Sequence, residues 1–259
     1  MTDGVPESGV DPELSKAIAE LSEEGVPPAE RKRLLRRIAG QVPIRRIGTM
    51  FRPKAAARWM ADTVAGVAPY IPVRDLETLR RHHDGLDGEA LADRLVRNAS
   101  RVTAGVGAAG GGIAAVEWAA TPTLLTAPVL LAAETVAVVA VEIKLIGELQ
   151  EVYRVPVPGT GAQRAVRLIQ AWSQQRGFNP LTPGVGIGAV LGTAARKELR
   201  DRLLRRFGRN ITTLGPLLTG AAVAGYLNRR ATQALGDRVR DDLRRRGRGA
   251  IEGTVVSDG

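Results

Sequence analysis

The stretch Ala132–Tyr153, AAETVAVVAVEIKLIGELQEVY, decides the fold. Wound as a helix at about 100° per residue, it presents apolar side chains on nearly every side, which is typical of a helix buried all round. Apolar residues recur at helical spacing through most of the chain, and strand-like alternation never persists. The sequence therefore predicts an all-α fold: a compact bundle of Gly/Ala-rich helical hairpins with an N-terminal helical extension and this segment in the middle.

Charged residues interrupt this apolar segment, and we treat Glu134, Glu142 and Lys144 as candidate buried charges. Lys144 and Glu148 lie one helical turn apart and can pair. Glu134 and Glu142 have no evident partner nearby and, if buried, need one from another helix, such as Arg167 or an arginine near the C-terminus. Two interpretations stay open: the charges line a partly hydrated face, which we favour, or they form a functional carboxylate site.

Proline and glycine divide the rest of the chain into further helices and loops. We expect four regions: an acidic, partly disordered arm with a short helix (1–25), a basic N-terminal helical region (26–88), a helical core (89–248) and a flexible tail (249–259). Proline-broken short helices and turns should occupy 45–75. A short helix is expected from Asp11 to about Glu24. Further helices are expected to begin after Pro28 and after Gly88 and to cover 127–153, 163–176, 185–207 and 214–246.

Small residues at helical spacing are the most unusual feature of the core. Glycine inside a helix costs about 1 kcal/mol relative to alanine, so repeated glycines need compensation. A row of them lets two helix backbones touch, in lipid or in a tightly packed soluble hairpin, and both environments stay open. The candidate helix-packing glycines are Gly107, Gly111, Gly184, Gly188, Gly192 and Gly220.

Two charge-free segments, Gly177–Ala195 and Asn210–Asn228, have nineteen residues each, just long enough for a membrane-spanning helix. Prolines interrupt both, and neither is rich in Leu, Ile or Phe, so insertion on hydropathy alone would be marginal. Arginines flank the second segment at both ends. That symmetry fits a re-entrant hairpin or a surface-lying helix better than a single span.

Charged residues of one sign cluster in separate segments of the chain, whose formal net charge is +10. The acidic segment 1–30 and the basic segment 31–60 nearly cancel. The stretch 196–248 holds fifteen basic and five acidic residues, an excess equal to the net charge of the whole chain. Such an excess favours contact with an anionic surface. The candidate contacts are Arg205, Arg206, Arg209, Arg229, Arg230, Arg244, Arg245 and Arg246.

Residue types exclude most catalytic classes. The chain has no cysteine, which removes thiol catalysis and thiolate metal sites and fits a reducing compartment. Gly105–Gly110 matches G-x-G-x-x-G but follows no strand, so it predicts helix packing. The two histidines, His82 and His83, precede several acidic residues. This pattern is more typical of a turn followed by an acidic helix N-terminus than of a metal site. We expect no catalytic, metal or cofactor site, and the acidic start predicts no secretory leader.

The second half of the chain resembles the EcsC-like family in the form found in high-GC bacteria. The resemblance covers roughly Leu91 to Arg246 and lies in AAETVAVVAVEIKLIGELQEVYRVP, RLIQAWSQQRGFNP and RNITTLGPLLTGAAVAGYLNRRATQALGDRVRDDLRR. It implies a helical, often membrane-associated protein encoded beside an ABC transporter, with no settled biochemical activity. It supplies no active-site residues.

These observations favour a non-enzymatic membrane-associated or scaffold protein at the cytoplasmic face of the membrane. Its partner would be an anionic membrane surface or a membrane protein such as a transporter. Nucleic-acid binding is an alternative that the pI of 10.8 suggests, but no helix-turn-helix or aromatic stacking platform supports it. An unrecognised lipid-directed enzyme using Glu134, Glu142 or the His82 region is another. The oligomeric state stays open.

Overall fold

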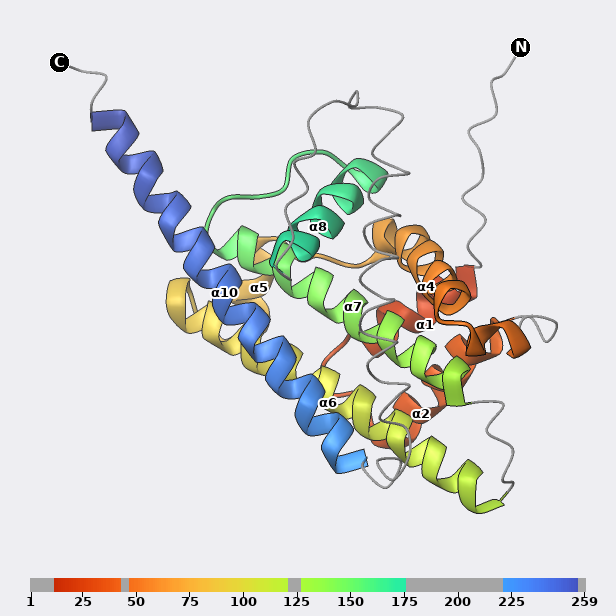
Figure 1. Cartoon of the computed structure of the whole chain (residues 1–259). Coiled ribbons are helices and arrows are strands. Elements are labelled where there is room, and N and C mark those ends of the chain that lie inside the picture. Colours follow the sequence, from red (N-terminus) through yellow and green to blue (C-terminus); the bar gives the residue numbers. More distant parts are fainter. Residues whose placement is uncertain (1–11, 43–46, 121–126, 176–220, 256–259) are drawn as a thin grey trace, which may run out of the picture.

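The computed structural model describes residues 12–42, 47–120, 127–175 and 221–255, and all regular structure in these ranges is helical (Figure 1). The predicted all-α class is therefore confirmed. The predicted helix 185–207, together with Gly184, Gly188, Gly192, Gly220, Arg205, Arg206 and Arg209, lies outside the described residues. The elements are α1 (Pro12–Leu21), α2 (Pro28–Gly40), η1 (Gly48–Phe51), α4 (Pro53–Val67), η2 (Ala68–Tyr70), α5 (Leu76–His82), α6 (Gly88–Ala120), α7 (Ala127–Val152), α8 (Gly161–Gln175) and α10 (Ala221–Val255).

Helix α7 runs through the middle of the molecule (Figure 1). It contacts α6, α2, α4, α8 and α10, and every residue from Thr135 to Leu149 is buried. A helix that is apolar all round exposes no hydrocarbon to water only when other elements cover each of its faces. The packing of α7 thus follows directly from the sequence that encodes it.

Helices α1 and α2 belong to the same hydrophobic core as α7. The buried residues of α1 include Leu14, Ile18 and Leu21, which recur at the spacing of one helical face. Leu34, Leu35 and Ile38 do the same in α2. The acidic start of the chain therefore includes a helix that packs against the core through its apolar side.

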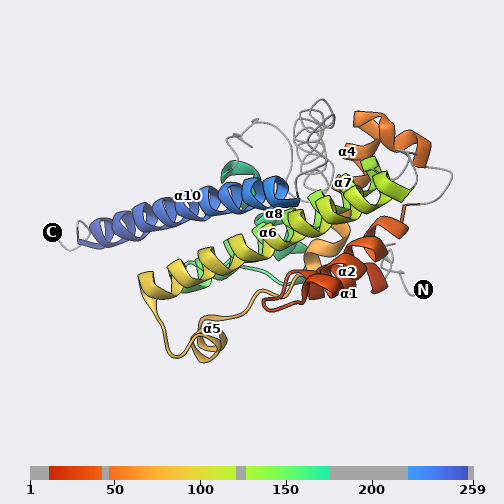
Figure 2. The same cartoon turned by 90° about the horizontal axis from the view of Figure 1, so that it is seen from below.

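Helices α6 and α10 are long and antiparallel, and they lie side by side in both views (Figures 1 and 2). Small residues make this approach possible. A Cβ atom added to Gly107 would lie 2.8 Å from the backbone carbonyl of Ala224, and one added to Gly225 would lie 2.9 Å from the carbonyl oxygen of Ala104. Gly111 faces the backbone of Ala221 in the same way.

Helix α10 is also longer than the sequence pattern indicated. It continues to Val255, whereas the sequence predicted that the helix ends at 246 and that a flexible tail begins at 249.

The close approach predicts that Gly107→Ala destabilises the fold. The added methyl group meets the rigid backbone carbonyl of Ala224 as well as the side-chain amide of Asn228, so α6 and α10 must move apart, at a cost of about 1–3 kcal/mol in the free energy of unfolding. Urea denaturation measures this loss. Gly40→Ala is the matched control, because a Cβ there meets nothing within 4 Å. An equal effect of the two substitutions would contradict the packing described.

Candidate functional site

The charged side chains of α7 are enclosed by other elements. Glu142 is 0% exposed, Lys144 and Glu148 are each 5% exposed, and Glu134 is half-buried. The favoured interpretation that these charges line a partly hydrated face is therefore wrong for Glu142 and Lys144. Helices from both ends of the chain pack against α7 and bury these charges. The helical periodicity of α7 alone does not show which other helices pack against it.

Glu142 is bound by helices α8 and α10. Trp172 on α8 donates its indole N–H to Oε2 at 2.8 Å, and Thr232 on α10 donates its hydroxyl to Oε1 at 3.1 Å. Trp172 is 3% exposed and Thr232 is fully buried. A buried carboxylate needs such donors, because leaving it unsatisfied costs several kcal/mol. Arg167, one candidate partner from the sequence, is exposed.

Glu134 performs a similar task near the glycine contacts of α6. Its Oε1 accepts a hydrogen bond from Asn228 Nδ2 of α10 at 2.8 Å, and its Oε2 lies beside Gly110 of α6. Thr103 of α6 donates its hydroxyl to the backbone carbonyl of Asn228 at 3.4 Å. Polar contacts thus fix the register of α6, α7 and α10 where small residues bring them together.

Lys144 pairs with Glu23 rather than with Glu148, which corrects the expected pairing within one helical turn. Its Nζ lies 2.7 Å from Glu23 Oε1, in the loop that follows α1. Arg74 also binds Glu23. Burial alone would raise the pKa of Glu23, but the hydrogen bond and charge of Lys144, together with those of Arg74, lower it. The loop is therefore attached to α7 by a carboxylate held between two cations.

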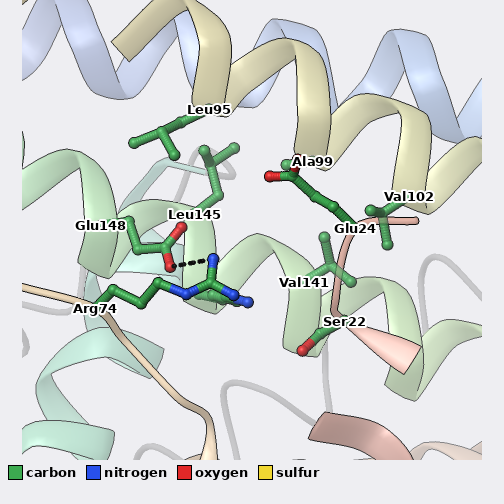
Figure 3. Close-up of a pocket in the computed structure, with 10 residues that line it drawn as sticks. Ser22, Glu24, Arg74, Leu95, Ala99, Val102, Val141, Leu145 and Glu148 are labelled. Carbon is green, nitrogen blue, oxygen red and sulfur yellow. Dashed lines mark ion pairs between the residues drawn. The ribbon is translucent and has the colours of Figure 1, made fainter. Parts of the chain in front are cut away.

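Glu148 completes a partly buried charge cluster, which consists of Glu23, Arg74, Lys144 and Glu148. Figure 3 shows the Glu148 carboxylate directed at the Arg74 guanidinium, and Oε1 lies 3.7 Å from Nη1. Burial raises the pKa of Glu148 to about 7, although Lys144 and Arg74 oppose the shift. A cavity of about 20 Å³ lies beside the cluster. The sequence drew attention to Lys144 but not to Glu23 or Arg74.

The arginines toward the C-terminal end of α10 are largely neutralised by carboxylates. Arg244 and Arg240 both bind Glu89 at the start of α6. The hydrogen bond from Arg244 is the main cause that lowers the pKa of Glu89 to about 2. Arg246 lies 2.8 Å from Asp242, and Arg245 lies 3.9 Å from the same side chain. Three of the predicted anionic contacts, Arg244, Arg245 and Arg246, are thus already engaged within the protein.

The start of α10 presents a different surface, which we call the α10 outer face: Val223, Tyr226, Leu227, Arg229 and Arg230. The three apolar residues are 44%, 58% and 57% exposed. Both arginines are exposed, and within the described ranges neither forms an ion pair with a carboxylate. Arg230 donates to the Tyr226 hydroxyl at 3.3 Å. Helical spacing places Val223, Tyr226, Leu227 and Arg230 on one stripe, a signal that charge counting missed.

Two features are absent from the described residues. None of the described helices is both long enough and apolar enough to cross a membrane. The described side chains also contain no cluster of three or more histidine, aspartate or glutamate residues suited to a metal ion.

Thr232→Val tests the bonding of Glu142. Valine keeps the shape of threonine but leaves one oxygen of a fully buried carboxylate without that donor, so we expect a loss of about 1–3 kcal/mol in the free energy of unfolding. Thr135→Val is the control, because that buried hydroxyl donates to the Leu131 carbonyl of its own helix. Denaturant unfolding of both variants provides the comparison, and a harmless Thr232→Val would refute the role of this bond.

Comparison with known proteins gives no match of any of three kinds. No protein-family model matches the chain. No curated protein matches its sequence, and no solved structure matches its fold.

Proposed function

We propose that the chain is a non-enzymatic helical protein that binds an anionic membrane surface, at the cytoplasmic face, through the α10 outer face. The observation that carries the proposal is the pairing of exposed apolar side chains with arginines on one stretch of one helix. Amphipathic helices that lie in a membrane interface combine these two kinds of residue.

Each component has a physical task at such an interface. Leu227 and Val223 would bury hydrocarbon among the acyl chains, and Tyr226 would place its ring at the depth of the headgroups, where tyrosine is enriched. Arg229 and Arg230 would pair with lipid phosphates, each contributing about 1 kcal/mol at low salt. The helix would lie on the surface rather than span it.

The inner face of α10 makes this binding compatible with the fold. Gly225, Asn228 and Thr232 are buried against α6 and α7, and they alternate with the outer-face residues along the helix. A membrane could therefore contact the outer face without displacing any of the contacts that hold α10 in place. The C-terminal arginines would first have to give up their carboxylate partners.

The resemblance to the EcsC-like family supports the same proposal, since that family is often membrane-associated and encoded beside a transporter. A transporter is thus a suitable neighbour for the bound protein. Nucleic acid is a weaker candidate ligand, because the phosphate backbone would be bound by arginines without a need for exposed Val223 and Leu227.

Flotation with lipid vesicles tests the proposal. Wild-type protein should float with phosphatidylglycerol vesicles at low salt, should be released by added salt, and should bind phosphatidylcholine vesicles weakly. Arg229→Gln combined with Arg230→Gln removes about 2 kcal/mol of attraction, so partitioning should fall roughly thirtyfold. Tyr226→Ser combined with Leu227→Ser should weaken binding even at low salt.

The double variant Arg245→Gln, Arg246→Gln is the matched control. It removes the same charge from the other end of the same helix, where both arginines lie beside Asp242. Equal losses for the two arginine pairs would show that net charge, not the α10 outer face, drives binding. Failure of the wild-type protein to float with either vesicle, or tighter binding to duplex DNA than to vesicles, would overturn the proposal.

A further inference from the structure

A small cavity lies where the N-terminal layer meets the core (Figure 3). Its volume of about 20 Å³ exceeds the roughly 10–15 Å³ that one water molecule requires. The wall comes from the loop after α1, from α6, from α7 and from the segment before α5. Its polar lining residues are Ser22, Glu24, Arg74, Lys144 and Glu148, and its apolar lining residues are Leu95, Ala99, Val102, Val141 and Leu145.

One oxygen in this wall is unsatisfied. Glu148 Oε1 is buried and accepts no hydrogen bond from the protein. The nearest cation, Arg74 Nη1, lies 3.7 Å away, beyond hydrogen-bonding distance. Buried polar atoms almost always have a partner, and a polar pair separated by more than 3.5 Å next to a cavity is the usual setting for a bridging water.

We propose that the cavity binds one water molecule between Glu148 and Arg74, and that proton binding by this hydrated Glu148 controls how firmly the loop Ser22–Val26 is held against α7. When Glu148 is protonated, Arg74 and Lys144 are both available to Glu23. When the proton leaves through the water to solvent, the buried carboxylate of Glu148 competes with Glu23 for the same two cations. The loop then opens more readily.

Deprotonation of Glu148 would loosen the loop Ser22–Val26, which attaches the α1–α2 layer to the core. Glu23 binds Lys144 and Arg74, and the neighbouring Glu24 accepts a hydrogen bond from Asn98 of α6 at 2.8 Å. The contacts with Asn98 and Lys144 join the α1–α2 layer to the core across more than seventy residues of sequence. Weakening them alters the attachment of that layer without changing the α6–α10 packing.

The sign of the pH effect follows from the shift at Glu148. Its pKa is about 7 in the folded protein against 4.5 for an unperturbed glutamate, so the folded form binds the proton more tightly. Stability from this group is complete below pH 4.5 and is lost as the pH rises through about 7. Local opening of the loop should therefore become easier on the alkaline side of neutrality.

Other titratable groups around the cluster are His83, His82, Arg94 and Glu24. Burial lowers the pKa of His83, with Arg74, Arg94 and His82 acting in the same direction and Glu24 opposing them. Its contribution to stability is therefore lost as the pH falls below 6.5, which is the opposite direction to Glu148. The two effects can be separated by substituting Glu148 alone.

Amide hydrogen exchange of peptides covering the loop 22–26, corrected for the intrinsic rate at each pH, tests the proposal. Between pH 6 and pH 8 the opening equilibrium of the wild-type loop should rise, by about tenfold where opening restores the unperturbed pKa of Glu148 and by less where α6 and α7 keep it partly buried. Glu148→Gln should remove this rise, because glutamine keeps the shape and does not titrate. Glu151→Gln, one turn further along α7 and paired with Arg164, should keep it.

Two measurements on the wild-type protein do not depend on a variant. Carboxyl ¹³C NMR should show one glutamate titrating near pH 7, and a high-resolution crystal structure should show a water within hydrogen-bonding distance of Glu148 Oε1. An empty cavity, titration of every glutamate below pH 5.5, or an unchanged pH response in Glu148→Gln would each overturn the proposal.

Discussion

The enclosure of α7 is the constraint on which the structure depends. Other elements must pack against all of its apolar faces, and these elements must also supply partners for its charged residues. Glu142 is bonded from α8 and α10, Glu134 from α10, and Lys144 from the loop after α1. Hydrophobic burial is roughly proportional to area and tolerates many arrangements, whereas an unpaired buried charge costs several kcal/mol. Packings that leave these charges unpaired are therefore disfavoured, and the partners that pair them lie far apart in sequence.

Close packing of α6 against α10 supplies the second constraint. Glycine in a helix costs about 1 kcal/mol relative to alanine, and this cost is offset where the helix backbones touch at Gly107 and Gly225. The contact also holds Asn228 where it can reach Glu134, so packing and polar bonding depend on each other. Because the inner face of α10 is committed to these contacts, its outer face is left to solvent over its first turns.

Local patterns predicted much of this, and long-range contacts account for what they missed. The period of apolar residues gave the helical class and the central place of Ala132–Tyr153, and the period of small residues pointed to Gly107 and Gly111. The partner of Lys144 could not be found that way, because Glu23 lies more than a hundred residues away and competes with a nearer glutamate. Counting charges also misjudged the arginines near the end of α10. The count gives the number of arginines but does not show which of them form ion pairs with carboxylates of the same protein.

Helix α10 therefore carries two kinds of arginine, and the difference between them comes from their neighbours rather than from their number. Arg240 and Arg244 face the acidic start of α6 and join two helices, so their charge is used within the fold. Arg229 and Arg230 stand beside exposed hydrocarbon, where an ion pair within the described protein would do nothing to cover Leu227. A ligand that offers negative charge and an apolar layer together satisfies both needs at once. A membrane surface has that composition, whereas a soluble polyanion does not.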